Sequence, residues 1–266
     1  MDERRCEEQF KACQECDVSK QLSASYKLTL ETLDNNLDTE IKPDGTVSFS
    51  TLYAFKKDPK EVFPPEKSNF EAAKKQAERT FRKILKKKDG LKEIKSMFAR
   101  GQAEGNFEIV NDTEASQILK APHFFCYQQV AYNPKSKTTP VRHICNPSNF
   151  NSEHMSSFNL AQMKPPNLMN RLLWGLQAFL LFQVPYSADI GHAYRRVGVK
   201  KEHQVFQLLV YYDFDKEDWY NHPKIVRQKT LLYGGILSET ILELAIRRAA
   251  KAMQDGDSKQ ILIYQR

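Results

Sequence analysis

Glycine, cysteine and long apolar runs are all scarce in this chain of 266 residues. Ten glycines exclude a collagen-like or glycine-rich linker protein. Five cysteines, an odd number without the spacing of a small disulfide framework, indicate reduced thiols. The longest apolar run, residues 172–182, is interrupted by Gly175 and Gln177 and is far shorter than the roughly 20 residues of a membrane span. The first residues are charged, and no apolar core of a secretory signal follows them. We therefore expect an intracellular protein, cytoplasmic or nuclear, without a membrane-spanning segment.

Charge is distributed unevenly along the chain, whose net charge is +7. Residues 1–40 carry 10 acidic and 5 basic side chains, whereas residues 56–100 carry 15 basic and 7 acidic ones. A basic face of this kind attracts phosphate polyanions, although a solvated helix surface has the same composition. If the face does bind nucleic acid, the binding should be salt-sensitive and tolerant of sequence.

Apolar spacing and turn residues predict both helices and strands in the first half of the chain. Ser68 and Glu71 have the spacing of a capping box at the start of a helix. The other expected elements are a short helix and a linker within residues 1–40, a strand from 46 to 50, helices over 68–85 and 91–98, a third helix from 112, and strands over 124–132 and 141–145 joined by a basic loop.

The second half of the chain has a more apolar pattern. Its expected elements are a helix over 167–181, strands over 182–190, 203–214, 225–233 and 260–264, and a helix over 238–253. We expect the strand that ends near residue 189 to pair with the strand over 260–264, and the helix from 238 to pack on one face of that sheet. The whole pattern predicts an α+β fold.

An acidic residue at a strand end is the sharpest local signal. Asp189 closes an apolar strand, and Gly191 and Tyr194 follow it. A carboxylate on a rigid element can bind a hard cation, and a glycine allows a ligand to approach the backbone closely. The competing interpretation is an aspartate that caps the turn after the strand.

Four segments, in order, resemble motifs of reverse transcriptases. Residues 187–194 resemble the first aspartate motif, and residues 137–146 resemble the hairpin of the fingers, with an arginine on a strand beside a basic loop. Residues 232–239 resemble the Phe-Gly-x-x-x-Ser-Pro turn, and residues 261–265 resemble the strand that leads into the Tyr-x-Asp-Asp box. The front of the chain is similar to the Bel/Pao class of LTR retrotransposons, and the resemblance covers roughly residues 40–266.

This resemblance implies the fingers and a partial palm of a right-hand polymerase, truncated before the Tyr-x-Asp-Asp box. The implied domains are a polar N-terminal helix and linker at 1–40, fingers-like helices with the basic hairpin at 41–154, and a partial palm at 155–266 with a fingers insertion at about 201–235. It further implies RNA or DNA template–primer, deoxynucleoside triphosphates (dNTPs) and other parts of a Pol polyprotein as partners.

The resemblance also implies roles for individual residues. Asp189 is the implied catalytic residue and, with the carbonyl of Ile190, an implied ligand of Mg²⁺, of which a complete enzyme holds two. The implied nucleotide-binding residues are Lys135, Lys137, Arg142, Gly191, Ala193, Tyr194, Tyr233 and Gly234. Among them Arg142 would form two parallel hydrogen bonds to phosphate oxygens, and Tyr194 would lie under the sugar.

Departures from the family pattern define the expected function. The Tyr-x-Asp-Asp box is absent, Asn146 stands where this class usually has Asp, and Glu239 replaces the usual Pro. We therefore expect a reverse-transcriptase-like domain of the RNA-directed DNA polymerase family that binds nucleic acid and dNTPs but does not polymerise by itself. The alternatives are a co-opted, non-catalytic nucleic-acid-binding protein and an unrelated α+β protein with chance motifs.

The cysteines offer little further chemistry. Cys13 and Cys16 form a Cys-x-x-Cys pair near Cys6, but no fourth ligand follows at zinc-finger spacing. Cys126 and Cys145 fall on the expected hairpin strands, where we expect buried thiols.

Overall fold

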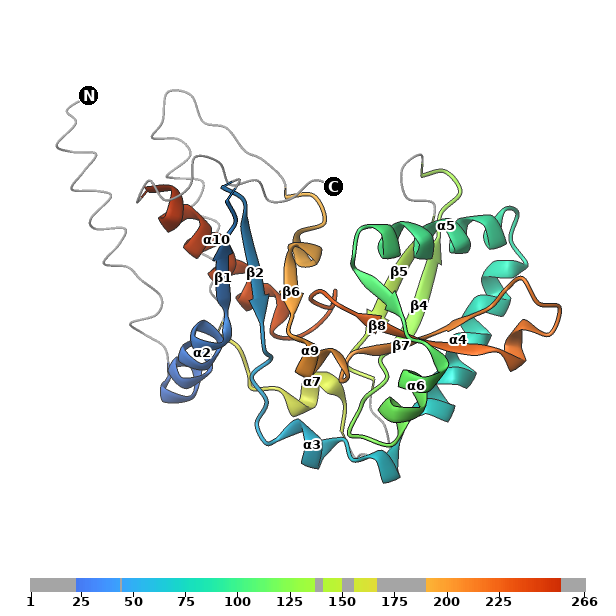
Figure 1. Cartoon of the computed structure of the whole chain (residues 1–266), viewed down its shortest axis with the longest axis horizontal. Helices are drawn as coiled ribbons and strands as arrows, with labels where there is room; N and C mark the ends of the chain where they lie inside the picture. The colour runs from blue at the N-terminus through green and yellow to red at the C-terminus, as the bar shows by residue number, and fades with distance from the viewer. Residues whose placement is uncertain (1–22, 44, 137–140, 150–155, 167–189, 255–266) are drawn as a thin grey trace.

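The computed structural model describes residues 23–43, 45–136, 141–149, 156–166 and 190–254 of the chain. Within these ranges helices are interspersed with short strands, which form two three-stranded sheets and one separate hairpin. The molecule is elongated, and the two sheets occupy opposite halves of its long axis (Figure 1). The described part therefore confirms the expected α+β class.

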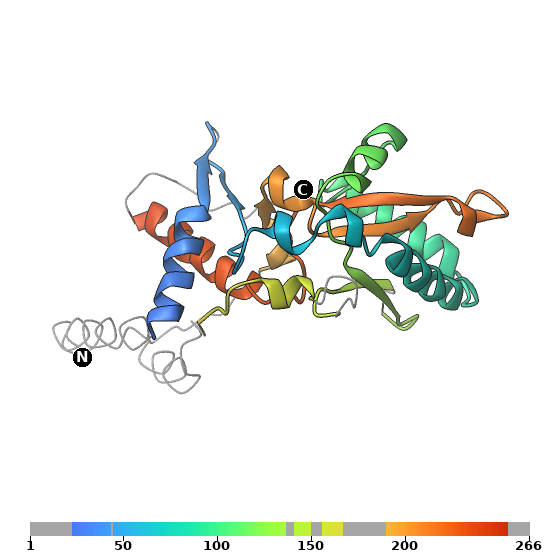
Figure 2. The same cartoon turned by 90° about the horizontal axis from the view of Figure 1, so that it is seen from below.

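The first sheet joins the N-terminal region to a segment far along the chain. Its order is β1 (Asp38–Ile41), β2 (Val47–Thr51) and β6 (Val197–Val199), with β1 and β2 antiparallel and β6 parallel to β2. Helix α10 (Ser238–Gln254) packs against this sheet, and α2 (Ala24–Asn36) lies against α10 (Figure 2). The Arg248 guanidinium of α10 binds the Asp34 carboxylate at 2.8 Å and so ties the two helices together.

The second sheet has the order β3 (Phe107–Ile109), β8 (Pro223–Gln228) and β7 (Leu208–Tyr212), with both pairs antiparallel. Almost all of β7 is buried, because helix α4 (Phe70–Leu85) packs against it. The hydroxyl of Tyr212 donates a hydrogen bond to the carbonyl of Lys74, at 2.8 Å, and this bond fixes the helix on the strand.

The expected hairpin is formed by β4 (Tyr127–Tyr132) and β5 (Val141–Asn146), which are antiparallel. Helix α4 docks on it through Gln76, which accepts a hydrogen bond from the Gln128 backbone N–H at 2.9 Å, and through Thr80, which donates to the Gln128 carbonyl at 3.2 Å. The apolar positions of α4 point inward as their 3.6-residue period predicted: Ala73, Ala77, Phe81 and Ile84 are all buried.

Short elements and one further long helix complete the fold. They are α3 (Pro59–Val62), η2 (Pro65–Lys67), α5 (Gly90–Ala103), α6 (Asp112–Leu119), α7 (Phe158–Ala161), η3 (Ala193–Arg196), α9 (Lys201–Gln204) and η4 (Trp219–Asn221). Among the described helices, none combines the length and the apolar character that a membrane crossing requires.

Several expected boundaries differ from the structure. The predicted capping box is wrong, because α4 begins at Phe70 after Asn69. The Ser68 hydroxyl accepts a hydrogen bond from the Phe70 N–H at 3.3 Å and also lies 2.6 Å from Nε2 of His123. The segment 203–207 belongs to α9 and the turn after it rather than to a strand, and β8 ends at Gln228. The expected elements over 167–181 and 260–264, and most of the strand over 182–190, lie outside the described residues, as does the pairing predicted between those two strands.

Candidate functional site

The predicted site loop lies between the undescribed segment that includes Asp189 and strand β6. Its backbone turns at Gly191 and at His192, whose φ of 55° is in the left-handed region. The Arg195 N–H donates to the His192 carbonyl at 2.8 Å, and Nε of Arg196 donates to the Gly191 carbonyl at 3.1 Å. Among the described residues, none has a heavy atom within 4 Å of where a Cβ atom at residue 191 would lie.

Two tyrosines that the sequence assigned to the site contact each other. The rings of Tyr194 and Tyr233 meet edge to face, with centroids 5.5 Å apart and an interplanar angle of 83°. Tyr233 is 66% exposed, whereas Tyr194 is half-buried. Partial burial, followed by the nearby Glu239 and Tyr233, raises the pKa of the Tyr194 hydroxyl, which therefore stays protonated and able to donate a hydrogen bond at neutral pH.

The turn that carries Tyr233 lies against the end of strand β5. Gly234 has a φ of 91°, and a Cβ atom there would lie 3.5 Å from the Cys145 carbonyl and 3.6 Å from the Pro147 ring. The turn is closed by Ser238, whose hydroxyl donates to the Leu232 carbonyl at 2.8 Å. Strand β5 also carries Arg142 at an exposed position, three residues before the Cys145 carbonyl that faces this turn.

Asn159 on α7 connects these segments, and sequence reasoning missed it. Its Nδ2 donates to the Ser148 hydroxyl at 2.7 Å and to the Gly234 carbonyl at 3.1 Å, and its Oδ1 accepts from the Ile236 N–H at 2.9 Å. Its partners in the turn lie 75 and 77 positions further along the chain, so no local pattern pointed to this role.

The other predicted site residues are only partly placed. Lys135 is exposed on the loop after β4, where its backbone N–H donates to the Asn133 side chain at 3.2 Å, and no contact joins it to the tyrosine pair. Ala193 lies in η3 and Ile190 is half-buried. Asp189 and Lys137 lie outside the described residues.

The predicted metal site is described only at its edge. Of its two ligands, only Ile190 belongs to the described part, where no cluster of three or more histidine, cysteine, aspartate or glutamate side chains is suited to a metal ion. Binding of Mg²⁺ through Asp189 stays a prediction from the motif.

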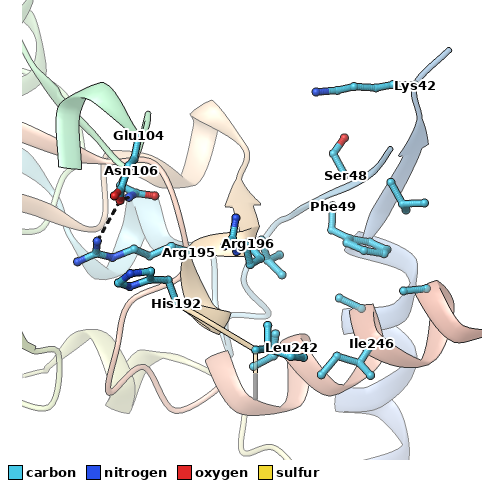
Figure 3. Close-up of a pocket in the computed structure, with 15 residues that line it drawn as sticks. Lys42, Ser48, Phe49, Glu104, Asn106, His192, Arg195, Arg196, Leu242 and Ile246 are labelled. Atoms are coloured by element: carbon cyan, nitrogen blue, oxygen red, sulfur yellow. Dashed lines mark hydrogen bonds and ion pairs between the residues drawn. The ribbon is translucent and has the colours of Figure 1, made fainter. Parts of the chain in front are cut away.

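A cavity of about 350 Å³ lies beside the site loop, within the size range of small-molecule sites (Figure 3). Its apolar wall comes from β2 and α10, including Phe49 and Leu242. Its polar rim includes His192 and Arg195 of the loop, and Arg195 is paired at 3.3 Å with Glu104. The site loop therefore contributes Tyr194 to the tyrosine pair and, separately, His192 and Arg195 to the lining of this cavity.

A shallower hollow of about 340 Å³ adjoins Asn159. Lys56 and Lys164 are exposed at its rim, and Nζ of Lys56 donates to the Leu160 carbonyl at 2.8 Å. Two cationic side chains therefore line the same hollow as Asn159.

No known protein family matches this chain when it is compared with family models. A comparison with curated proteins also finds no match. The resemblance to reverse transcriptases therefore stays a prediction that rests on the four motifs and on their order in the chain.

The two described cysteines are buried, as expected, at and before the hairpin strands. Burial raises the pKa of the Cys145 thiol to about 12 and raises that of Cys126 well above its ordinary value. Both thiols are therefore protonated and poorly nucleophilic at neutral pH.

Proposed function

We propose that this chain is a reverse-transcriptase-like domain of the RNA-directed DNA polymerase family, which binds a dNTP and a template–primer. The observation that carries the proposal is the meeting of three separate segments: Tyr194 from the site loop, the Tyr233–Gly234 turn, and the end of strand β5. The sequence motifs had assigned all three segments to one nucleotide site before their positions were known.

The chemistry of this surface suits a nucleotide. An exposed aromatic ring at Tyr233, beside a glycine without a side chain, offers a flat surface to a sugar or base. The guanidinium of Arg142 can form two parallel hydrogen bonds to phosphate oxygens. Gly191 has no side chain, and no described residue lies within 4 Å of its Cβ position, so the backbone there can approach a triphosphate closely.

Catalysis requires more carboxylates than the motifs supply. Phosphoryl transfer with two metal ions needs several carboxylate oxygens, and no two adjacent aspartates occur in these 266 residues. Asp189 and the Ile190 carbonyl would hold Mg²⁺, which neutralises triphosphate charge when bound. We therefore propose that this polypeptide by itself binds nucleotide and nucleic acid without extending a primer.

Nucleotide binding by matched variants tests the proposal. Arg142→Gln should weaken binding of a Mg²⁺–dNTP roughly tenfold to a hundredfold, because a charge-assisted hydrogen bond contributes about 1.5–3 kcal/mol. Tyr233→Ala should weaken it roughly tenfold through lost stacking. The controls are Arg100→Gln, at an exposed position of α5, and Tyr220→Ala, whose ring is 41% exposed on η4. Titration calorimetry measures all four, and equal effects in variants and controls would refute the nucleotide site.

Primer extension tests the catalytic part separately. With Mg²⁺, template–primer and all four dNTPs, the purified chain should give no product above background. Extension that disappears in Asp189→Ala would overturn this part of the proposal, because some other acidic residue would then complete the metal site.

A further inference from the structure

The connection between α4 and α5 carries an unneutralised cluster of lysines. Several basic side chains in this region have carboxylate partners: Lys74 with Glu71, Arg82 with Glu78, and Lys95 with Asp215. Another set, at the junction of the two helices, is exposed and has no ion pair in the described part of the chain: Lys83, Lys86, Lys87, Lys88 and Lys92. We call these five residues the lysine corner.

The backbone of the lysine corner is held in one conformation. The Lys87 N–H donates to the Ile84 carbonyl at 2.8 Å, and the Gly90 N–H donates to the Lys87 carbonyl at 3.0 Å. Asp89 has a φ of 60°. A Cβ atom at residue 90 would lie only 2.0 Å from the Ile84 carbonyl oxygen, so only glycine allows α5 to start this close to the last turn of α4.

This fixed geometry concentrates positive charge at one place. The neighbouring acids are the exposed Asp89 and the half-buried Glu93, which are fewer than the five lysines. Like charges this close together along the chain repel each other, and a bound polyanion would relieve that repulsion.

A hydrogen bond joins the lysine corner to the hairpin. The hydroxyl of Tyr132, the last residue of β4, donates to the Lys88 carbonyl at 2.5 Å. The loop that follows β4 carries the exposed Lys135, and β5 carries the exposed Arg142. In Figure 1 the α4–α5 connection lies at the end of the molecule that also holds the hairpin, well away from the first sheet.

We propose that the lysine corner binds the phosphate backbone of a nucleic acid, outside the nucleotide site described above. Five separate exposed cations fit a partner with regularly repeated anionic groups better than they fit one small anion. The corner has no amide or aromatic side chain to read base edges, so its binding is independent of sequence. This inference rests on the proposed function only in that the partner is a nucleic acid.

The inference also specifies which residues of the basic segment 56–100 we expect to contact nucleic acid. Lys74, Arg82 and Lys95 are already paired with carboxylates. The other exposed basic residues of the segment are more widely spaced, whereas the corner places five exposed lysines within residues 83–92. We therefore expect the corner to make the largest contribution to nucleic-acid binding.

The test compares two triple variants that remove the same charge. The corner variant is Lys86→Gln, Lys87→Gln and Lys88→Gln, and the control variant is Lys57→Gln, Lys60→Gln and Lys67→Gln, at positions that are equally exposed. Fluorescence anisotropy of a labelled mixed-sequence oligonucleotide measures affinity from about 50 to about 200 mM salt. Across this range the wild-type affinity should fall roughly 20- to 40-fold more than that of the corner variant, because each lost phosphate contact lowers the slope by about 0.7–0.9. The control variant should keep the wild-type slope.

Several outcomes would overturn the inference. Equal slopes in the two variants would show that only net charge matters. Equally tight binding of polyglutamate, lost equally in the corner variant, would identify a site for acidic polypeptides. A chain that binds Mg²⁺–dNTP but no oligonucleotide would refute the lysine corner and leave the nucleotide site intact, whereas loss of both would refute the proposed function as well.

Discussion

Acid should destabilise this protein through His143, a histidine of strand β5 that is enclosed by other side chains. Its ring lies between Phe98 and Phe107, with centroids 5.8 and 6.0 Å away. Nδ1 faces the Cys145 sulfur at 3.9 Å, and Nε2 lies 2.7 Å from Oε1 of Gln128. The Gln128 amide nitrogen donates to a backbone carbonyl of β7, so its oxygen faces the histidine and Nε2 carries the proton of the neutral ring.

Protonation of Nδ1 is unfavourable in this environment. Burial, and then the positive charge of Arg195, lowers the pKa of His143 to about 4 from its ordinary value of 6.5. The unfolded chain binds the proton more readily than the folded one. The free energy of unfolding is therefore unaffected by this histidine above pH 6.5 and decreases as the pH falls from 6.5 towards 4. Between pH 7 and pH 5 the free energy of unfolding should fall by about 1–2 kcal/mol, and the lower figure allows for the residue as a whole being only half-buried.

Urea unfolding at several pH values measures this effect. His143→Gln removes the titrating group but keeps an amide that can donate to Gln128. The variant should therefore lose about 1–2 kcal/mol less stability than the wild type between pH 7 and pH 5. His203, whose pKa burial also lowers to about 4, adds a loss of the same sign to both proteins and cancels in the comparison. Parallel curves for the two proteins would refute the reasoning.

Two further substitutions should change stability in opposite directions. Asn69→Ala should lower the free energy of unfolding, measured by chemical denaturation, by about 2–5 kcal/mol. The reason is that the Asn69 side chain donates to the carbonyl of the buried Phe125 at 2.8 Å and accepts from its N–H at 2.9 Å. A decrease below about 1 kcal/mol would contradict this account. Gln162→Leu should leave the melting temperature unchanged or raise it, because both polar atoms of this buried amide lack a hydrogen-bond partner in the described structure. A clear drop in melting temperature would show that the amide does form hydrogen bonds in the folded protein.

Elements with a strong local pattern could be predicted from the sequence. The helix from Ser238 and the antiparallel β4–β5 pair were both expected close to their observed bounds. In each case the apolar residues repeat with the period of the element and turn residues flank it, so the local signal and the packed core agree. The helical pair α4 and α5 followed from the same rule.

Elements decided by distant partners could not be predicted. The Ser68–Glu71 spacing is typical of a capping box, but the Ser68 hydroxyl contacts both the Phe70 N–H and His123, which is 55 positions away. The adjacent Asn69 binds the backbone of Phe125. The expected strand over 203–214 starts late because the Gln207 side chain is used to donate hydrogen bonds to the carbonyls of Gln228 and Thr230. Local propensity is weak compared with such buried hydrogen bonds.

The candidate site combines both kinds of information. Tyr194 and Tyr233 were chosen from motifs, but their contact depends on a turn whose backbone is fixed by Asn159 and Ser238. Burial of a tyrosine ring removes about 150–250 Å² from water and would favour folding, yet this turn keeps Tyr233 66% exposed. The hydrogen bonds from Asn159 and Ser238 hold this backbone so that it presents an aromatic ring to solvent, and the exposure itself adds nothing to stability. This is the physical reason to look for a ligand that stacks on the ring.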